Sequence, residues 1–535
     1  MSEVLRSQFE DELPRIIEII KACDFISIDT EFTGLQTRDN DNPSLFDSPA
    51  ERYVKLKRIA KQFTICQFGL SAFVKHPTEN RYESRTYNFY LFPIACSTVD
   101  DNFACQASSV EFLCKHKLDF NKFIYEGIPY LNGDQERELR QQLHLQPILL
   151  SREHLDEYLL NKYTSAVAEW IPTAKEDEQL LLENKPDLQV GFTSLKVQAV
   201  LRRQFPEIWT SVNELGEIRI QKISNKSRNE LEESSECLEE RLLEKVIGFS
   251  KVFQAIVQAK KPVVGHNMLL DLCFIFEKLH RPLPATYLEF KEKVHRILPF
   301  IFDTKHLARK FKKVLSDRGL CESSNLEDLY TSLDSHRGRF CVLHSPDIGF
   351  AEAYDKYKQH GHPHEAGYDS FITGYVFLRM GHLLAVKDMG SKYCQPQHFT
   401  SYLHAFRNCE NCVYIARATS DYVNFGGPDP VSNRPDWLHI RITDSNIQAN
   451  SLQLAAIFGV YDSVDVRVLD KQCAILAVAS YRGAKDILRA FQKHKSLKVA
   501  KYNVLQHSPT VRLLLWSGVA VSGLVCLWAF LPPCR

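Results

Sequence analysis

The spacing of apolar residues along the chain predicts an α/β fold. Residues 9–22 carry apolar side chains at helical spacing, and residues 24–29 form a short apolar run typical of a buried strand. Residues 63–70 and 85–92 also have strand character. Strand and helix patterns resume at residue 261 and continue to about residue 390. Together these segments predict a mixed sheet with flanking helices.

Two further regions differ from this pattern. Residues 150–245 are rich in Leu, Glu and Lys, and we expect an insertion that is mostly helical with one pair of strands. Residues 437–491 show the order β-α-β-β-α, which is much of an RNA-recognition motif. Such motifs stack bases on aromatic residues of the central strands, and residues 473–478 contain none. We therefore expect a structural or partner-binding domain there.

The C-terminal residues 513–531 form an uncharged apolar run. As a helix this run would be about 28 Å long, close to the thickness of a bilayer core. We therefore predict a single-pass tail anchor in the endoplasmic reticulum or the mitochondrial outer membrane. A buried core helix is the alternative, and the position at the chain end disfavours it. Basic residues before the run place the catalytic part in the cytosol. They are Lys493, Lys495, Lys498, Lys501 and Arg512.

Composition and charge restrict the picture only slightly. The 66 basic and 66 acidic residues cancel, so any RNA-binding surface must be a local patch, and the neutrality also fits a protein that binds no polyanion. The charged N-terminus lacks a secretory signal, which indicates a reducing compartment and free thiols for the fifteen cysteines. Cys409 and Cys412 lack the second ligand pair that a zinc site needs.

Four acids and one histidine are candidates for catalysis. Asp29 and Glu31 end the first strand, and residues two apart on a strand share a face. Asp271 follows another buried strand at the start of a helix, and Asp369 lies near a helix start five residues after His364. Each feature alone has an ordinary explanation, such as a solvated acid, a favourable charge at a helix N-terminus or a surface histidine.

The order of these groups favours a metal site. Four carboxylates in one place repel one another unless cations neutralise them. Two Mg²⁺ ions, or Mn²⁺ in their place, are the expected cofactors, and they would support phosphodiester hydrolysis. His364 would act as the general base towards the attacking water.

Four blocks of this sequence, residues 25–34, 265–271, 302–305 and 364–374, resemble the DEDDh exonucleases, and within them the poly(A)-specific ribonuclease branch. The resemblance covers the chain to about residue 390 and implies an RNase H-like sheet. It also implies that Asp29, Glu31, Asp271 and Asp369 are metal ligands and that His364 is the general base.

The resemblance further implies three substrate-binding residues. Phe32 matches a position near the terminal nucleotide, and Asn267 and Lys305 match positions that line the substrate. Lys305 is expected either to contact a phosphate or to be an ordinary surface lysine. The insertion resembles the small RNA-binding insertion of the branch only faintly, which leaves the preference for poly(A) open.

The resulting domain organisation has six segments. Residues 1–149 and 246–395 are expected to form the exonuclease domain, interrupted by a degenerate RNA-binding-like insertion at 150–245. The other expected segments are an RNA-recognition-motif-like domain at 396–500, a linker at 501–512 and the transmembrane helix at 513–531.

The predicted activity is metal-dependent 3′-to-5′ hydrolysis of single-stranded RNA, releasing 5′-monophosphates. With the apolar tail, the resemblance points to membrane-bound trimmers of PIWI-interacting RNA precursors. The expected partners are an RNA 3′ end, PIWI-bound precursors, a membrane adaptor protein, the membrane itself and a second copy of the chain. A poly(A) deadenylase and an inactive RNA-binding scaffold are the alternatives, and the intact acid set argues against the scaffold.

Overall fold

The computed structural model describes most of the chain. The expected boundary between the exonuclease domain and the insertion, at residues 149–150, lies outside the described residues, as does Leu531, the expected end of the membrane anchor. The described chain divides into two compact units. Unit 1 comprises residues 1–41, 55–414 and 424–427, and unit 2 comprises residues 42–54, 415–423 and 428–535. The structure describes residues 3–530 except 38–40, 94–98, 100, 146–156, 183–191, 214–216, 235–237, 355, 359–361, 390–394, 445–448 and 508.

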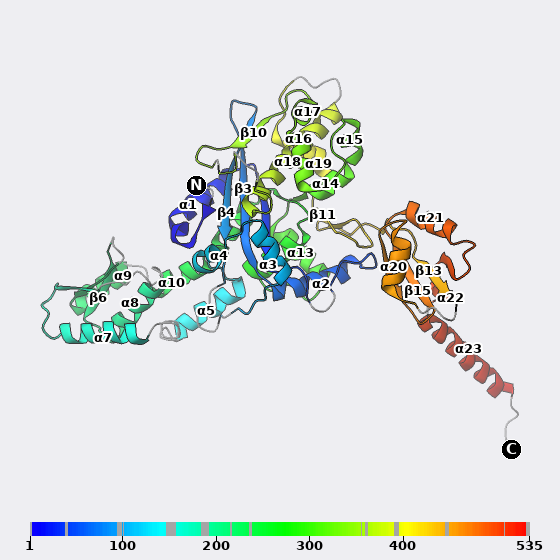
Figure 1. Cartoon of the computed structure of the whole chain (residues 1–535). Coiled ribbons are helices and arrows are strands. Elements are labelled where there is room, and N and C mark those ends of the chain that lie inside the picture. Colours follow the sequence, from blue (N-terminus) through cyan, green and yellow to red (C-terminus); the bar gives the residue numbers. More distant parts are fainter. Residues whose placement is uncertain are drawn as a thin grey trace, which may run out of the picture. The chain divides into compact units, whose positions relative to one another are not determined.

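A seven-stranded mixed sheet forms the centre of unit 1. The strand order is β1-β4-β3-β2-β8-β9, and β10 pairs with β4. The pairs β2–β3 and β3–β4 are antiparallel, whereas β2–β8 and β8–β9 are parallel. Figure 1 shows β3 and β4 lying side by side. The strands are β1 (Glu3–Val4), β2 (Phe25–Phe32), β3 (Ile65–Lys75), β4 (Arg81–Tyr90), β8 (Val263–Gly265), β9 (Ile301–Asp303) and β10 (Asp347–Phe350).

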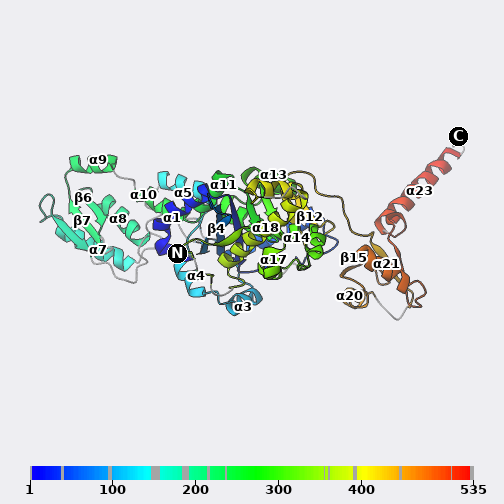
Figure 2. The same ribbon diagram turned by 90° about the horizontal axis from the view of Figure 1, so that it is seen from above.

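Helices cover both faces of this sheet. The helix α18 (Ala366–Met389) packs on one face, where the Ser27 hydroxyl donates a 2.7 Å hydrogen bond to the Ser370 carbonyl. On the other face, the ring of Phe68 packs against Phe249, which precedes α11 (Ser250–Ala259). The helices α11 and α1 (Arg6–Ala22) lie against each other (Figure 2). The mixed sheet with flanking helices is therefore as predicted.

The insertion contains one strand more than predicted. Its sheet has the order β5-β7-β6 and is covered by two helices, with Leu182, Val167 and Leu201 in its core. The prediction of a single strand pair missed β5, because its sequence Gln-Leu-Leu-Leu is too short to show alternation. The elements are α7 (Glu157–Trp170), β5 (Gln179–Leu182), α8 (Phe192–Gln204), β6 (Ile208–Val212) and β7 (Ile218–Lys222).

Unit 2 contains a four-stranded antiparallel sheet of order β14-β15-β13-β16. The β-α-β-β-α order predicted for residues 437–491 is confirmed, and β16 completes the sheet. Two helices pack on one face of it around Leu454, Phe458 and Ile487. The elements are β13 (Leu438–Ile442), α20 (Ser451–Gly459), β14 (Val464–Val468), β15 (Cys473–Val478), α21 (Tyr481–Ala490) and β16 (Leu497–Lys501).

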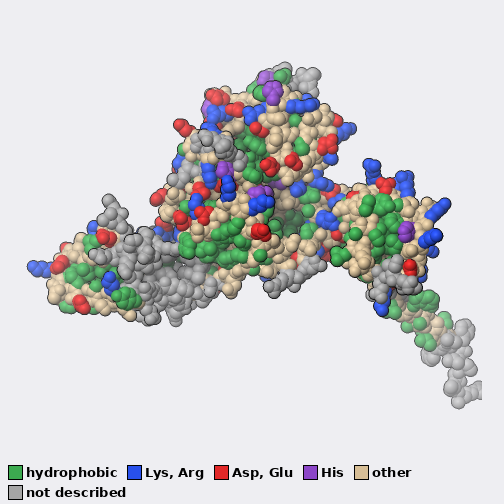
Figure 3. Space-filling view, in the orientation of Figure 1, with side chains coloured by type: hydrophobic (Ala, Val, Ile, Leu, Met, Phe, Trp, Pro, Cys, Tyr) green, Lys and Arg blue, Asp and Glu red, His purple; other side chains and the backbone are tan. Residues whose placement is uncertain are grey.

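The structure contradicts the predicted tail anchor. Within the described part of the chain, no helix combines the length and the apolarity that a membrane crossing needs. The predicted run lies in the helix α23 (Pro509–Phe530). The side chains of residues 513–526 of this helix are exposed (Figure 3). The predicted single-pass localisation in an intracellular membrane is therefore wrong.

The remaining elements connect these layers. They include α2 (Pro49–Gln62), α3 (Ala107–Lys115), α4 (Phe120–Glu126), α5 (Gly133–Leu145), α9 (Asn225–Ser234), α10 (Leu238–Ile247), α12 (Leu269–Ile275), η1 (Phe276–His280), α13 (Tyr287–Ile297), α14 (Thr304–Lys310), α15 (Lys312–Asp317), α16 (Leu326–Asp334), α17 (His336–Phe340), α19 (Phe399–Phe406), η3 (Arg407–Cys409), β11 (Cys412–Tyr414), β12 (Tyr422–Asn424) and α22 (Val504–His507).

Candidate active site

The first two acids lie on the central strand β2. Asp29 and Glu31 share the face of Ser27, which is the face that α18 covers. Because β2 pairs with β3 on one side and with β8 on the other, its backbone is held from both sides. The register shifts between Glu31 and Phe32, so Glu31 lies where the regular ladder ends.

The third acid, Asp271, lies in the first turn of α12, directly after β8. The chain reaches it through a turn at Asn267, whose φ of 61° is in the left-handed region. The Thr30 hydroxyl of β2 donates a 2.5 Å hydrogen bond to Oδ1 of Asp271. This bond ties the N-terminus of α12 to β2.

The fourth acid and the histidine come from the start of α18. Asp369 lies in its first turn, and Oδ2 of Asp369 accepts a 3.2 Å hydrogen bond from the backbone N–H of His364. One ligand atom each of Glu31, His364 and Asp369 lies within 4.8 Å of the others. Residues 333 positions apart in the chain therefore share one site.

A glycine allows this close approach. Gly69 on β3 lies opposite Asp29 in the sheet, and a Cβ atom added to Gly69 would lie 1.8 Å from the carbonyl oxygen of Ala366. Any side chain there would collide with the backbone at the start of α18. The absence of a side chain at residue 69 thus allows the start of α18 to lie close to the sheet.

The carboxylates raise one another's pKa values. Burial, followed by the charges of Asp369, Asp271 and Glu31, raises the pKa of Asp29 well above its usual value. Burial and the charges of Asp369 and Asp271 do the same for Glu31. Burial raises the pKa of Asp271 to about 6 and that of Asp369 to about 7. A site that must be fully ionised at neutral pH therefore needs positive charge from a ligand.

His364 occupies an aromatic corner. Its ring packs edge-on against His116 at 4.2 Å and against Phe112 at 4.8 Å, and both belong to α3 or its C-terminal cap. Burial and then the charge of His116 lower the pKa of His364. A neutral imidazole can accept a proton or bind a metal, so the site keeps His364 in the form that either role needs.

The donor set fits a hard divalent cation. Mg²⁺ and Mn²⁺ prefer carboxylate oxygens, and an imidazole is acceptable to Mn²⁺. Glu31, His364 and Asp369 have the spacing of metal ligands, and Asp29 and Asp271 add two further carboxylates to the same charged cluster. The chemistry of the residues present therefore matches the predicted metal site.

The other matched residues lie at the neighbouring strand end. The backbone N–H groups of Asn267 and Lys305 both donate to Oδ1 of the buried Asp303, at 3.1 and 2.9 Å. The Asn267 side chain is exposed, and the Lys305 ammonium lies 5.4 Å from the centre of the Tyr414 ring. Burial lowers the pKa of Lys305. Lys305 is thus half-buried.

Phe32 has a structural role that the sequence did not reveal. Its buried ring stacks on Phe274 of α12 at 4.0 Å. One edge of Phe32, together with Glu31, also borders a hollow of about 300 Å³. The rest of the lining comes from Leu35, Gln36, Gln106, Ser108, Ser109, Phe112 and Leu113. A hollow that opens beside Glu31 can admit a nucleotide.

Sequence reasoning missed four residues that shape the site: Thr30, Gly69, His116 and Asp303. Asp303 had a local signal, because an acid between a strand and a helix is a common N-cap. Thr30 had a weaker signal as the middle residue of the Asp-Thr-Glu motif. Gly69 and His116 act through contacts with α18 and His364, which no local pattern indicates.

Comparison with known proteins adds the decisive observation: residues 4–377 match the family described as CAF1 family ribonuclease. The chain belongs to the CAF1 ribonuclease family. It is 35% identical to the mouse poly(A)-specific ribonuclease PNLDC1, over 99% of this chain and 98% of that protein. It is 31% identical to the pre-piRNA 3′-exonuclease trimmer of Bombyx mori over 98% of both, and 30% identical to human poly(A)-specific ribonuclease PARN over 94% and 80%.

Among solved structures, the chain is similar to S. pombe Pop2p in its Mg²⁺- and Mn²⁺-bound form, with 17% identity and a TM-score of 0.34 over 71% of this chain and 91% of that one. Membership of the CAF1 family confirms the predicted resemblance and the α/β RNase H-like fold. It also confirms the predicted enzyme class, because the family and the full-length relatives are ribonucleases. The protein is a 3′-to-5′ exoribonuclease.

Proposed function

We propose that this exoribonuclease shortens the 3′ ends of single-stranded precursors of PIWI-interacting RNAs and releases 5′-monophosphates. The observation that carries the proposal is the convergence of Glu31, His364 and Asp369 with Asp29 and Asp271 in one site. The match to the Bombyx mori pre-piRNA trimmer along almost the whole chain supports the choice of substrate.

The acids would hold two Mg²⁺ ions, or Mn²⁺, through Asp29, Glu31, Asp271 and Asp369. When bound, such ions stabilise the charge that builds on the phosphorus and on the leaving 3′ oxygen. The residues of the chain supply the rest. Thr30 and the backbone of His364 orient Asp271 and Asp369 by hydrogen bonds, and α3 fixes the His364 ring. His364 accepts the proton of the attacking water.

Three residues are proposed to bind the RNA. Phe32 would contact the terminal nucleotide through the hollow beside Glu31, and Asn267 would reach the substrate from the exposed turn before α12. Lys305 would contact a phosphate through its half-buried ammonium, as basic side chains do in nucleic-acid complexes. The preference for RNA would come from contacts to the 2′-hydroxyl.

A poly(A) deadenylase is the second candidate. The names of PNLDC1 and PARN, both called poly(A)-specific ribonucleases, favour it. It uses the same chemistry and differs only in the RNA. An inactive scaffold is disfavoured, because such a protein has no reason to keep buried acids that raise one another's pKa.

The domain boundaries stay proposals. We propose an exonuclease domain at residues 1–149 and 246–395, with the insertion at 150–245 as a degenerate RNA-binding module. We propose that residues 396–500 form an RNA-recognition-motif-like domain, supported by the sheet order β14-β15-β13-β16, and that 501–512 form a linker. A homodimer and a partner that delivers PIWI-bound RNA also stay predictions.

The test uses purified full-length protein, Mg²⁺ and 5′-labelled single-stranded RNAs. One RNA is poly(A), one is a free mixed sequence, and one is a mixed sequence held by a PIWI protein with its 3′ end protruding. We expect stepwise shortening of both mixed-sequence strands, and shortening of the PIWI-bound strand to a defined length. Shortening of poly(A) alone would establish the deadenylase instead.

Variants link the activity to the site. Asp29→Ala should abolish shortening, and His364→Ala should slow it by about 10²–10⁴-fold, as for a lost general base. The matched control is Asp11→Ala, which removes an exposed acid of α1 and should leave the rate unchanged. Hydrolysis by Asp29→Ala at the wild-type rate would refute the metal-site assignment.

A further inference from the structure

Residues 44–52, which we call the strap, belong to unit 2 although they lie far from it in sequence. The C-terminal sheet has two faces, because alternate residues of a strand point to opposite sides. Leu438 and Ile440 of β13 and Leu476 of β15 face α20 and α21. The opposite face, which we call the outer face, is the side on which an RNA-recognition motif stacks bases.

Apolar side chains of the strap cover part of the outer face. Leu45 and Phe46 are 3% and 5% exposed and pack with Ile475 and Ala477 of β15. The Phe46 ring meets Trp437 edge-on at 5.2 Å. The guanidinium of Arg467 on β14 lies 4.6 Å from the centre of the Phe46 ring. A ring from the chain itself therefore fills a position at which a base would stack.

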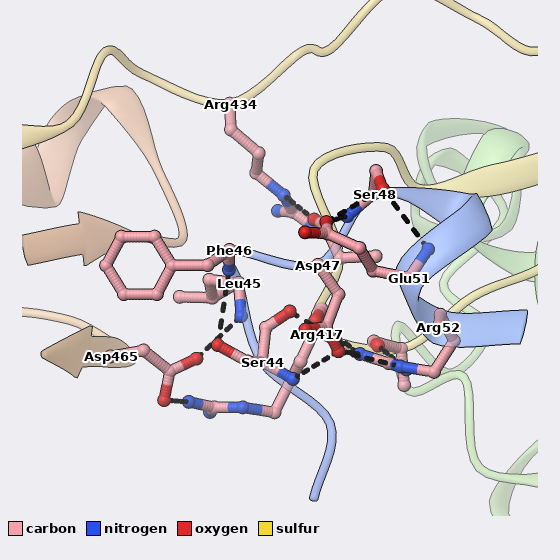
Figure 4. Close-up of polar contacts among 12 residues, drawn as sticks. Ser44, Leu45, Phe46, Asp47, Ser48, Glu51, Arg52, Arg417, Arg434 and Asp465 are labelled. Atoms are coloured by element: carbon pink, nitrogen blue, oxygen red, sulfur yellow. Dashed lines mark hydrogen bonds and ion pairs between the residues drawn. The ribbon is translucent and has the colours of Figure 1, made fainter. Parts of the chain in front are cut away.

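Polar contacts fix the strap in register. The backbone N–H of Leu45 donates a 2.6 Å hydrogen bond to Oδ2 of Asp465, whose Oδ1 accepts another at 2.6 Å from Arg417 (Figure 4). One carboxylate on β14 thus binds both the strap and the segment that precedes the sheet.

A buried ion pair closes the other end of the strap. Nη2 of Arg52 lies 2.9 Å from Oδ2 of Asp47, and both side chains are almost fully buried. Arg52 also donates to the carbonyls of Ala416 and Arg417, at 2.6 and 2.7 Å (Figure 4). The backbone N–H of Thr419 donates to the Asp47 carbonyl at 2.8 Å. The strap is therefore a built-in component of unit 2.

Aromatic residues of the same chain cover more of the outer face. His439 of β13 stacks on His507 with ring centres 4.1 Å apart. Tyr502 lies between them and Trp437, at 5.8 Å from His507 and 6.0 Å from Trp437. Together with Phe46, these rings form a continuous row across the sheet. The rings of this row stack on or lie against one another, and Trp437, Tyr502 and His507 are only partly exposed.

The strap also continues the chain from the active site. Glu31 and Phe32 are followed by Leu35 and Gln36, which line the hollow beside Glu31. Both backbone N–H groups are held by Oε1 of Gln106, at 2.9 and 3.0 Å. The Thr37 hydroxyl donates to Asp41, and Asp41 pairs with Arg58 of α2, the helix that also carries Arg52 of the strap.

We propose that the outer face of the C-terminal sheet is a docking site for the strap rather than for RNA bases, and that docking keeps the Leu35–Gln36 wall in the shape that binds RNA. Leu45, Phe46 and Asp465 are then positioning residues for the exoribonuclease. The binding half of this proposal rests on the proposed function, whereas the docking half does not.

The first measurement is hydrogen exchange on full-length protein. Phe46→Ser should raise exchange of residues 44–52 by about tenfold or more, because the strap loses its main apolar anchor. Phe46→Leu should keep wild-type exchange. The control, Val460→Ser, changes a residue that is 84% exposed on the opposite side of the sheet and should alter nothing. Unchanged exchange in Phe46→Ser would overturn the docking.

The second measurement separates positioning from general stability. Phe46→Ser should raise KM for single-stranded RNA by about three- to thirtyfold with kcat changed less than about twofold, because none of the strap contacts described above involves a proposed metal ligand. A released strap with an unchanged KM would overturn the positioning role. If Phe46→Ser does not fold, Asp465→Ala replaces it, because that change removes the polar anchor of the strap and the bond to Arg417 but keeps the apolar anchors of the strap, and it should give the same split.

The third measurement maps the RNA directly. Photo-crosslinking of full-length protein to RNA containing 4-thiouridine should give no adduct on β13 or β15 peptides. An adduct there would overturn the proposal and make the sheet a base reader. If wild-type protein shortens no RNA, the proposed function fails, while hydrogen exchange still decides whether the strap docks.

Discussion

Asp369 shows how a single residue links electrostatics to catalysis. Burial raises its pKa to about 7, with Glu327 and Glu365 adding to the effect, and the N–H of His364 opposes it. The folded protein without metal therefore holds a proton that the unfolded chain releases near pH 4. Because the native state binds more protons over this range, its stability falls as the pH rises from about 4 to about 7.

Asp369→Asn should therefore stabilise the metal-free protein at pH 7.5, by on the order of 2 kcal/mol, while abolishing activity. The check is urea unfolding in EDTA at pH 5.5 and 7.5, with the gain expected mainly at the higher pH. Added Mg²⁺ should stabilise wild-type protein far more than the variant. A variant less stable than wild type in EDTA at pH 7.5 would contradict the electrostatic account.

The sequence was most informative at the residue scale. The sequence order of four acids and one histidine indicated a shared site. Each acid lies at a strand end or a helix start, where the local backbone determines the direction of the side chain. These residues are Asp29, Glu31, Asp271, His364 and Asp369. Their metal-binding and catalytic roles stay proposals. The contacts that tune them could not be predicted, since His116 meets His364 across 248 positions of sequence.

At the scale of elements, Asp303 joins several chain segments. Its Oδ1 accepts from the N–H groups of Asn267, Lys305 and His306, and its Oδ2 accepts from those of Met268 and Tyr414. One buried carboxylate thus satisfies the turn before α12, the N-terminus of α14 and the strand β11. Backbone donors in a buried position need such an acceptor.

Asp303→Ala should lower the free energy of unfolding by about 3–5 kcal/mol, because five donors lose their acceptor. Asp303→Asn should cost less, because its side-chain oxygen can keep the three bonds at Oδ1. Urea unfolding of unit 1 measures both losses. Equal losses in the two variants would show that the charge, not the hydrogen bonds, carries the effect.

Elements were predictable where the signal was local. The patterns at residues 9–22 and 24–29 gave α1 and β2 within a few residues. The edge strands β1 and β10 were not foreseen, because both are short and pair with β4 from distant parts of the chain. The tail anchor was predicted from the apolar run alone, and no helix in the described part of the chain combines the length and the apolarity of a membrane span.

At the scale of the whole molecule, the two units have separate cores and should unfold in separable steps. No pattern in the sequence indicated that residues 42–54 belong with the C-terminal sheet, because Leu45 and Asp465 are 420 positions apart. Contacts between residues so far apart in sequence form only when the whole chain is folded, so no local pattern predicts them.

Arg52→Met should lower the free energy of unfolding of unit 2 only. It leaves the buried carboxylate of Asp47 without its guanidinium, which typically costs about 3–5 kcal/mol. Hydrogen exchange should show faster opening of β13–β16, while the Mg²⁺-dependent protection of β2 stays as in wild type. Equal acceleration in both units would show that they unfold as one.

The missing side chain at Gly69 has a consequence for judging relatives of this enzyme. An alanine there would keep every carboxylate and the histidine, yet its Cβ would collide with the Ala366 carbonyl and displace the start of α18, which carries Asp369. A homologue can therefore lose its chemistry while its signature letters stay intact. A prediction of which family members are active should therefore examine this glycine together with the acids.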